Sequence, residues 1–455
     1  MAEQTLLSPT ITHPPVTDIA RIGEPKIDSP LKERMIKGGY KNSKTFITDQ
    51  DRVVIDPLFQ TLKKSMADGE EPLSFELAGP REKIYFDPKK LKCAIVTCGG
   101  LCPGINSVVR ATVLDLYHNY GVVNILGIRY GFEGLIPKYG HEVIELTPKV
   151  IRDVHNAGGT FLSSSRGQQD VGEMVDALER LNIGLLFSIG GDGTLRATEK
   201  ISEEIANRGL KISVIGIPKT IDNDINYLSR SFGFDTAVEV ATQVIRSAHQ
   251  EALGAPNGIG LVKLMGRYSG FIACNAALAQ RDVNFCLIPE ADFDLEGEHG
   301  FFAELQTRIE HSGHAVIVVA EGAGQKFFKQ EELGKDASGN IKLGDIGVYL
   351  KDSINAYFKS RNFTVNLKYI DPSYTIRSVP ANANDRIYCG FLGQLAVHAG
   401  MAGKTNMLIA LWNDAYVHMP IKTVISERKC VNIKSRLWQS VLESTGQPPM
   451  VNDVS

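Results

Sequence analysis

The segment with the strongest chemical signal is Pro218-Lys219-Thr220-Ile221-Asp222-Asn223-Asp224, which directly follows an apolar run ending at Ile217. Side chains alternate between two faces in an extended chain, so we expect Thr220, Asp222 and Asp224 to lie on one face. Two carboxylates and a hydroxyl together suit the removal of a proton from a substrate hydroxyl beside a metal ion. The alternative interpretation is an acidic, solvated turn.

Two glycine-rich segments also follow apolar runs. Gly190-Gly191-Asp192-Gly193-Thr194 places a carboxylate among three glycines, where it would repel a phosphate unless a cation lay between them. We therefore expect Asp192 to hold Mg²⁺ against phosphate groups; the alternative is that it caps the next helix. Gly99-Gly100 precedes a predicted helix, and bare backbone N–H groups there can approach an anion closely. A tight turn without a ligand is the alternative for that segment.

Further charged side chains follow the later apolar runs. Arg267 stands near the start of a predicted helix, where the helix dipole disfavours a cation, so a nearby anionic ligand explains it better. Glu321 lies beside glycines and is suited to accept hydrogen bonds from sugar hydroxyls. Lys368, Tyr374 and Arg377 could together hold a phosphate monoester; as separate residues, the two cations would be solvated surface charges.

The elements that must position these residues alternate along the chain. Short, almost wholly apolar runs are typical of strands covered on both faces, and amphipathic stretches lie between them. The expected strands are 92–98, 123–128, 183–189, 212–217, 260–264, 285–288, 315–320 and 406–411, and the expected helices include 172–181, 194–208, 235–252 and 300–312. This alternation predicts two parallel sheets, whose ligands would bind beyond the carboxyl ends of the strands.

The predicted fold class is therefore α/β, with two Rossmann-like parallel-sheet domains, an N-terminal extension and a C-terminal tail. Prolines near the N-terminus favour extended chain and turns over a regular domain, and we expect the extension to wrap a neighbouring surface. The expected division is 1–90 for the extension, 91–233 with a returning segment 381–425 for the first domain, 234–380 for the second, and 426–455 for the tail.

Composition limits the classes of partner. The chain has 455 residues and a formal net charge of −3, so no basic surface field indicates nucleic acid or an anionic membrane. It contains no apolar run of about 18 residues, and its N-terminus has neither the basic nor the apolar region of a secretory signal, so we expect a cytoplasmic protein. The seven cysteines are expected to be reduced and mostly buried.

Five motifs occur in order and at suitable spacings: GGLCPGIN, GGDGT, PKTIDNDI, MGRYSG and AEGAGQ. Together they resemble the motifs of the phosphofructokinases over roughly residues 85–420, and most closely those of the long-chain ATP-dependent branch of plants and trypanosomatids. The resemblance implies transfer of a phosphoryl group from ATP to the 1-hydroxyl of fructose 6-phosphate, a glycolytic reaction, with Mg²⁺ as cofactor. It places ATP in the first domain and the sugar phosphate in the second. It also implies allosteric control and a homo-oligomer, either a tetramer or a dimer.

The resemblance further implies a role for each matching residue. Asp222 is the expected base, with Thr220 at the same hydroxyl region and Asp224 as a supporting carboxylate. The nucleotide is expected at Gly100, Arg166, Gly167, Gly191, Asp192, Gly193 and Thr194, with Asp192 binding the metal. The sugar phosphate is expected at Thr220, Asp222, Met265, Gly266, Arg267, Glu321, Lys368, Tyr374 and Arg377, of which Arg267 is also catalytic. Short bacterial relatives carry Arg and His where this chain has Lys368 and Tyr374.

The phosphoryl donor depends on Gly193 and Lys219. Relatives that use pyrophosphate carry Asp and Lys at these positions, short ATP-using relatives carry Gly at both, and the long ATP-using branch combines Gly with Lys, as here. An Asp at 193 would fill space and add negative charge on the route of the α-phosphate, so Gly193 favours ATP. A pyrophosphate-dependent enzyme is the alternative. Loss of Asp222 or Asp192 would have indicated a non-catalytic subunit of the same fold, and both are present. A GGDGT-type kinase acting on NAD or lipid would not need MGR, PKTIDND and the sugar-phosphate residues together.

Overall fold

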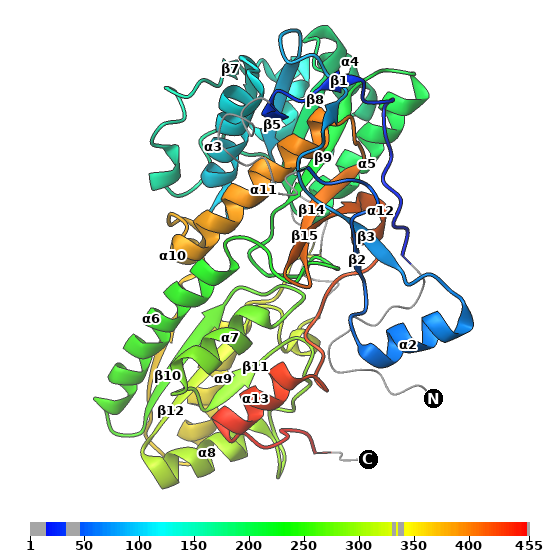
Figure 1. Ribbon diagram of the computed structural model, residues 1–455. Coiled ribbons are helices and arrows are strands. Elements are labelled where there is room, and N and C mark those ends of the chain that lie inside the picture. Colours follow the sequence, from blue (N-terminus) through cyan, green and yellow to red (C-terminus); the bar gives the residue numbers. More distant parts are fainter. Residues whose placement is uncertain (1–14, 33–45, 330–333, 335–340, 453–455) are drawn as a thin grey trace.

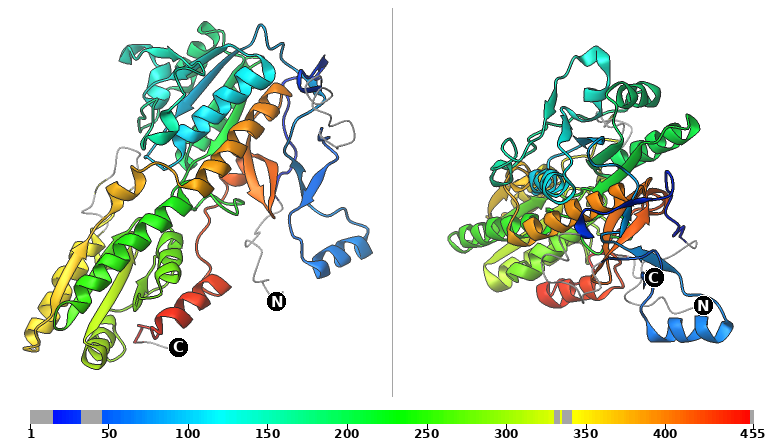
Figure 2. Two further views of the ribbon diagram at one scale, coloured as in Figure 1. Left: turned by 60° about the vertical axis from the view of Figure 1, so that its left-hand side comes forward. Right: turned by 45° about the horizontal axis from the view of Figure 1, so that its top comes forward.

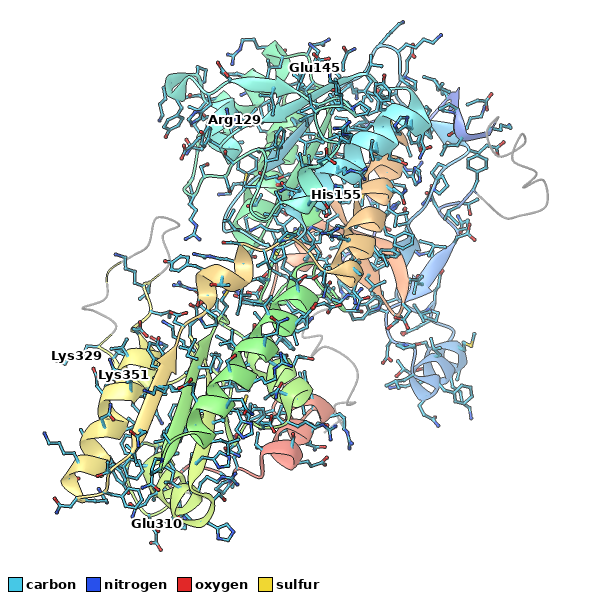
Figure 3. All side chains as sticks on the ribbon, turned by 90° about the vertical axis from the view of Figure 1, so that its left-hand side faces the viewer. Arg129, Glu145, His155, Glu310, Lys329 and Lys351 are labelled. Carbon is cyan, nitrogen blue, oxygen red and sulfur yellow. The ribbon has the colours of Figure 1, made fainter. Side chains whose placement is uncertain are left out.

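The computed structural model describes residues 15–32, 46–329, 334 and 341–452. It forms two α/β bodies, each built on one main sheet, which lie at the top and bottom of Figure 1. In Figure 3 the labelled Arg129 and Glu145 mark the body with the larger sheet, and Glu310 and Lys351 mark the other. Within the described part of the chain, no helix combines the length and the apolar character needed to cross a membrane.

The larger sheet has nine strands and is mixed, whereas the sequence predicted parallel sheets. Its order is β2 (Arg52–Val54), β3 (Ser74–Leu77), β15 (Ala415–Pro420), β14 (Met407–Trp412), β9 (Ser213–Pro218), β8 (Leu185–Gly190), β5 (Lys92–Thr97), β6 (Asn124–Ile128) and β7 (Val143–Glu145). The central strands from β14 to β6 are parallel, and every residue of β8 and β9 is buried. The outer strands pair antiparallel because hairpins and the N-terminal segment add to both edges.

Four helices accompany the central strands along the chain: α3 (Ile105–Asp115) follows β5, α4 (Val171–Arg180) precedes β8, α5 (Asp192–Asn207) follows β8 and α11 (Ala383–Met401) precedes β14. A π-helical turn lies at Leu116–Tyr120. Each helix buries one face against the sheet; α4, for example, buries Met174, Val175, Ala177 and Leu178. The α4 N-terminus is capped by Asp170, whose side chain accepts a hydrogen bond from the N–H of Glu173.

The smaller sheet is wholly parallel and has four strands. Its order is β11 (Phe285–Leu287), β12 (His314–Ala320), β10 (Gly258–Leu264) and β13 (Asn366–Ile370). The helices beside it are α6 (Phe234–Leu253), α7 (Phe271–Gln280), α8 (Phe301–Ser312) and α9 (Ile346–Ser360). The short α10 (Ser373–Arg377) follows β13. In Figures 1 and 2, α6 runs along this body and α11 along the other.

The N-terminal segment is more regular than predicted. Strands β2 and β3 extend the large sheet, and Ile27–Asp28 (β1) pairs with Lys83–Ile84 (β4). Helix α2 (Phe59–Asp68) has no buried residue and projects from the molecule in Figure 2. The extended chain that the prolines predict is ordered into short strands by pairing with β15, which lies more than 330 residues further along the chain.

The C-terminal segments return to both bodies. Strand β14 pairs with β9, and α12 (Ile421–Val424) packs on α5. The chain then crosses to the other body, where α13 (Arg436–Thr445) packs against α7. All seven cysteines are free, and Cys430 in this crossing segment is the exposed one.

Candidate active site

The loops that carry the polar motifs meet because their strands are neighbours. Strands β5, β8 and β9 are adjacent and parallel, so the loops that follow them lie at one edge of the large sheet. Strands β10 and β12 are likewise adjacent and parallel in the small sheet. The carboxyl edges of such sheets are where α/β proteins bind ligands.

The segment from Thr220 to Asp224 is a turn, not the extended chain that the sequence predicted. Asn223 has φ of 57°, a left-handed conformation that breaks the alternation of side chains. The turn nevertheless brings two of the three side chains together, because Thr220 Oγ1 donates a 2.6 Å hydrogen bond to Asp224 Oδ1. Asn223 Oδ1 accepts a hydrogen bond from the N–H of Ser231 and thereby fixes the turn.

Asp222 occupies the position between these paired residues, and its environment favours the protonated form. Its Oδ1 atom is buried and accepts no hydrogen bond from any described residue. Burial, together with the nearby carboxylates of Asp224 and Glu321, raises the pKa of Asp222 to about 8. A hydrogen bond from the backbone of Arg267 and the charge of Lys219 act in the opposite direction. Because Glu321 and Arg267 follow strands of the small sheet, Asp222 lies where the two bodies meet.

Lys219 and Arg166 converge on the first glycine-rich loop. Lys219 Nζ donates a 2.7 Å hydrogen bond to the carbonyl of Gly100. A Cβ atom at Gly100 would lie 3.2 Å from Nη2 of Arg166, so the guanidinium rests directly over this backbone. The Lys219 side chain is buried, which lowers its pKa. The exposed Gly167, with φ of 109°, continues the chain from Arg166.

The second glycine-rich loop forms the start of α5. Gly190 cannot carry a side chain, because a Cβ atom would lie 2.2 Å from Oγ1 of the buried Thr194. Gly191 is the N-cap residue, and Asp192 is the first residue of the helix. A Cβ atom at Gly193 would meet nothing within 4 Å, so this position opens onto free space. The helix N-terminus therefore presents N–H groups and an open surface that suit a phosphate.

Asp192 is paired with two arginines. Its Oδ2 atom lies 3.1 Å from Nε of Arg196, one helical turn along α5, and 3.6 Å from Nη2 of Arg428 in the C-terminal segment. Asp192, Asp224 and Arg428 line a common cavity of about 70 Å³. The motifs at 190–194 and 218–224 thus contribute side chains to one partly open cavity.

On the small sheet, backbone hydrogen bonds join two of the predicted loops. The N–H of Glu321 donates to Leu264, and the N–H of Gly322 donates to Gly266. Gly266 has φ of 129°, and a Cβ atom there would lie 2.4 Å from the carbonyl oxygen of Ser269. The loop from Met265 to Gly270 is a turn, and α7 begins at Phe271, four residues after Arg267.

The predicted substrate-binding residues of the small-sheet body differ in their burial and in the contacts that they make. Met265 is buried, and burial raises the pKa of Glu321. The guanidinium of Arg377 lies over the ring of Tyr374, 4.5 Å from its centroid, and its charge lowers the pKa of Glu321, as does that of Arg267. Lys368 is exposed and lies within β13, two residues before the strand ends. No hydrogen bond or ring contact between described residues joins it to Tyr374 or Arg377.

The fit to Mg²⁺ rests on Asp192. Among the described residues, no three His, Cys, Asp or Glu side chains gather into a cluster that could hold a metal unaided. Mg²⁺ is commonly held by one or two carboxylates together with substrate phosphates and water. A carboxylate that is 36% exposed at a helix N-terminus suited to phosphate fits that pattern, provided that it exchanges its arginine partners for the metal.

Sequence reasoning missed the C-terminal contribution to this site. Arg428 and Lys429 lie in residues 425–432, which no motif marked. Lys429 donates its backbone N–H to the carbonyl of Asp224, and its side chain donates to the carbonyl of Leu228. The only sign of this contribution in the local sequence is two adjacent cations. Their place in the site depends on the path of the C-terminal tail through the fold.

The fold and the site together define an α/β phosphotransferase, with the N-terminus of α5 and the raised-pKa carboxylate of Asp222 on loops that follow the adjacent strands β8 and β9. The family model of phosphofructokinase matches residues 92–401. The ATP-dependent 6-phosphofructokinase of Borreliella burgdorferi is 51% identical over 436 residues, which cover 94% of this chain and 96% of the relative. The chloroplastic ATP-dependent 6-phosphofructokinase 4 of Arabidopsis thaliana is 46% identical, covering 93% and 79% of the two chains. The ATP-dependent 6-phosphofructokinase of Trypanosoma brucei brucei is 48% identical, covering 82% and 77%. This chain therefore belongs to the phosphofructokinase family.

Solved structures show the same fold at lower identity. A pyrophosphate-dependent phosphofructokinase from Marinobacter aquaeolei superimposes with a TM-score of 0.65 at 18% identity, covering 80% of this chain and 94% of that one. The phosphofructokinase of Pichia pastoris gives a TM-score of 0.61 at 18% identity, covering 91% of this chain and 48% of that one. These likenesses concern the architecture, so the choice of phosphoryl donor rests on the site and on the closer relatives.

Proposed function

We propose that this protein is an ATP-dependent 6-phosphofructokinase, which transfers the terminal phosphoryl group of ATP to the 1-hydroxyl of fructose 6-phosphate in glycolysis. The observation that carries the mechanism is the position of Asp222, whose buried Oδ1 accepts no hydrogen bond from the described residues and whose pKa is raised by burial to about 8. A carboxylate of raised pKa is a stronger base than an exposed one. Relatives at 51% and 46% identity that carry the ATP-dependent name support the donor.

In this mechanism Asp222 removes the proton of the 1-hydroxyl as the sugar oxygen attacks the terminal phosphorus of ATP. Phosphoryl transfer depends chiefly on positioning and on neutralising charge, and the donors available here are the N–H groups of the α5 N-terminus and the cations of Lys219 and Arg267. Mg²⁺, when bound, neutralises charge on the phosphates. Thr220 and Asp224 hold the turn that presents Asp222.

The substrates occupy opposite sides of Asp222 in this proposal. ATP binds over Gly100, Arg166 and Gly167 and along Gly191–Thr194, with Asp192 turned to Mg²⁺. Fructose 6-phosphate binds at Met265, Gly266, Arg267 and Glu321, with its 6-phosphate at Tyr374 and Arg377. Lys368 can join the 6-phosphate only by reaching beyond the end of β13 from its place inside the strand. The two bodies thus act as the ATP-binding domain, 91–233 with 381–425, and the sugar-phosphate-binding domain, 234–380.

Gly193 supports ATP over pyrophosphate as donor. The space beside this residue is open, so the remaining phosphates of ATP can pass there without meeting a side chain. A coupled assay with fructose 6-phosphate and either ATP or pyrophosphate, each with and without Mg²⁺, tests the donor. Of these four conditions, only ATP with Mg²⁺ is expected to give activity. Activity with pyrophosphate but not with ATP would overturn the assignment of ATP as the donor.

The assembly and location follow from the same proposal. We expect a homo-oligomer, a tetramer or a dimer, with allosteric control, and light scattering of the purified chain measures its mass. A cytoplasmic location is expected; some close relatives are named as chloroplastic, so fractionation of the source cell is the appropriate test.

A further inference from the structure

The C-terminal segment 425–432, here called the strap, crosses the site from one body to the other. On the large-sheet side, Arg428 pairs with Ile225 in an antiparallel bridge, and the N–H of Lys429 donates to the carbonyl of Asp224 at 3.0 Å. On the small-sheet side, the N–H of Val431 donates to Oε1 of Glu290 at 2.6 Å. The strap is therefore fixed at both ends, directly beside the turn that carries Asp222.

Glu290 joins the strap to the loop that contains Arg267. The same carboxylate that binds Val431 also accepts the N–H of Gly270, at 3.0 and 3.1 Å from its two oxygens. Cys430 adds a contact from its Sγ to the carbonyl of Tyr268. The strap thus has a defined position relative to loops of both bodies.

Of the two cations in the strap, Lys429 has a structural role. Its Nζ donates a 2.7 Å hydrogen bond to the carbonyl of Leu228 and lies 5.0 Å from the centroid of the Phe271 ring. Burial lowers its pKa to about 8. These contacts anchor the strap to the Leu228 backbone and to the start of α7.

Arg428, in contrast, points into the site. Its guanidinium stacks over the ring of Tyr268, 3.8 Å from the centroid, and lies 3.6 Å from Oδ2 of Asp192. A third of its side chain remains exposed, and it lines the cavity shared with Asp192 and Asp224. Stacking fixes the plane of the guanidinium, while the loose ion pair leaves its N–H groups available to a stronger anion.

We propose that Arg428 contacts the terminal phosphate of bound ATP and positions it for transfer. The inference rests on the proposed function, in which that phosphate lies between the loop at Asp192 and the base Asp222. Arg428 is held at this junction, since its backbone adjoins Ile225 and its side chain reaches Asp192. Asp192 would hold Mg²⁺ when the metal is bound, and the Arg428 guanidinium would then be free to pair with phosphate oxygens instead of that carboxylate. It thereby adds positive charge to a centre rich in carboxylates.

The test compares nucleotide binding to Arg428→Gln, Arg428→Lys and the native chain, with Lys434→Gln as a control at an exposed position of the same tail. Calorimetric titrations use the Mg²⁺ complexes of ADP and of β,γ-imido-ATP. Because a hydrogen bond to a charged group contributes about 10- to 100-fold in affinity, Arg428→Gln should weaken the triphosphate analogue by about 10-fold or more. ADP binding should change by less than about twofold, since ADP lacks the terminal phosphate. Arg428→Lys should lie between the native chain and Arg428→Gln.

Equal weakening of both nucleotides, or of neither, would overturn the proposal. Kinetics in an Asp192→Asn background distinguish direct contact of Arg428 with the phosphate from a purely structural role that acts through Asp192. There Arg428→Gln should still lower kcat, whereas the absence of a further loss would mean that Arg428 acts only through Asp192. If Asp192→Asn left the Mg²⁺ requirement unaltered, the metal-binding role of Asp192 in the proposed function would be contradicted. The comparison of ADP with the triphosphate analogue would still decide the role of Arg428. A matched melting temperature and unchanged binding of fructose 6-phosphate show that each variant is folded.

Discussion

Thr220 Oγ1 donates a 2.6 Å hydrogen bond to Asp224 Oδ1, across a turn whose central carboxylate, Asp222, is left without such a partner at Oδ1. This hydrogen bond distinguishes Asp224 from Asp222, although the two carboxylates are only two residues apart. Asp224 Oδ1 is engaged in holding the turn, whereas Asp222 Oδ1 accepts no hydrogen bond from the described residues, which favours Asp222 as the proposed base. Thr220 also accepts the N–H of Asp222 at 3.2 Å, which ties the backbone of the base to the same hydroxyl.

The raised pKa of Asp222 predicts a specific pH dependence. Since the base must be ionised to act, kcat/KM for fructose 6-phosphate should fall as pH decreases below about 8, the pKa in the unliganded enzyme. Thr220→Val, which removes the hydroxyl that occupies Asp224, should alter this profile, while Thr220→Ser should retain it. A native profile that is flat from pH 6 to 9 with a chemical step limiting would contradict the assignment.

The same group predicts how stability changes with pH. A folded-state pKa above the ordinary aspartate value of 3.8 means that the folded chain keeps a proton that the unfolded chain loses, so the contribution of Asp222 to stability declines as pH rises from about 4 to 8. Asp222→Asn removes this carboxyl and should therefore gain stability relative to the native chain as pH rises through that range. Urea unfolding at pH 5 and pH 8 measures the difference, and an equal effect at both values would contradict it.

Gly193→Asp should damage the use of ATP without damaging the fold. A Cβ atom at this position meets nothing within 4 Å, and an acidic residue in the first turn of α5 suits the helix dipole. The melting temperature should be unchanged or higher, whereas KM for ATP should rise by about tenfold or more because a carboxylate next to phosphates costs about 1.4 kcal/mol or more. Gly193→Asn, of the same size and uncharged, separates charge from volume and should have a smaller effect.

Lys404 should be essential for attaching the N-terminal segment. It is 1% exposed, and its Nζ lies 2.5 Å from Oε2 of Glu76 in β3 and 3.0 Å from Oδ1 of Asp49. Lys404→Met leaves Glu76 buried without this partner and should cost about 3–5 kcal/mol of unfolding free energy. The control Lys434→Met, at an exposed site, should change stability by less than about 0.5 kcal/mol. Denaturant titrations measure both, and equal effects would show that the buried pair contributes nothing particular.

Glu76 itself predicts acid sensitivity in the same cluster. Burial opposes its ionisation, but hydrogen bonds from His418 and Lys404 outweigh burial and hold the pKa of Glu76 at about 2. A depressed carboxyl pKa contributes stability that is present above the unfolded value of about 4.5 and is lost as pH falls toward 2. Glu76→Gln should therefore be less stable than the native chain at pH 7, and the gap should narrow in acid. A gap that stays constant down to pH 3 would contradict this.

The central strands and their loops were predictable because burial on both faces leaves an apolar sequence. The run predicted at 183–189 is observed as β8 at Leu185–Gly190, and the one at 212–217 as β9 at Ser213–Pro218. The neighbouring positions of β5, β8 and β9 could not be read from the sequence, yet they bring the motifs at Gly100, Asp192 and Asp222 to one edge.

Features that depend on distant partners were not predictable. Strands β2 and β3 are short, and their pairing exists only because β15 lies beside β3. The turn at Asn223 replaces an extended segment, since its left-handed φ is stabilised by Ser231. Arg428 reaches Asp192 from the C-terminal tail, 236 residues away along the chain, and no local pattern marks such a contact.

The central claim is that Asp222 is the base of phosphoryl transfer from ATP to fructose 6-phosphate. The most direct measurement is the turnover of Asp222→Ser, together with calorimetric binding of fructose 6-phosphate to the same variant. Removal of a general base costs about 10²- to 10⁴-fold, so kcat should fall by at least about 100-fold while sugar-phosphate affinity stays within about threefold. A variant that binds fructose 6-phosphate and turns over at the native rate would contradict the account.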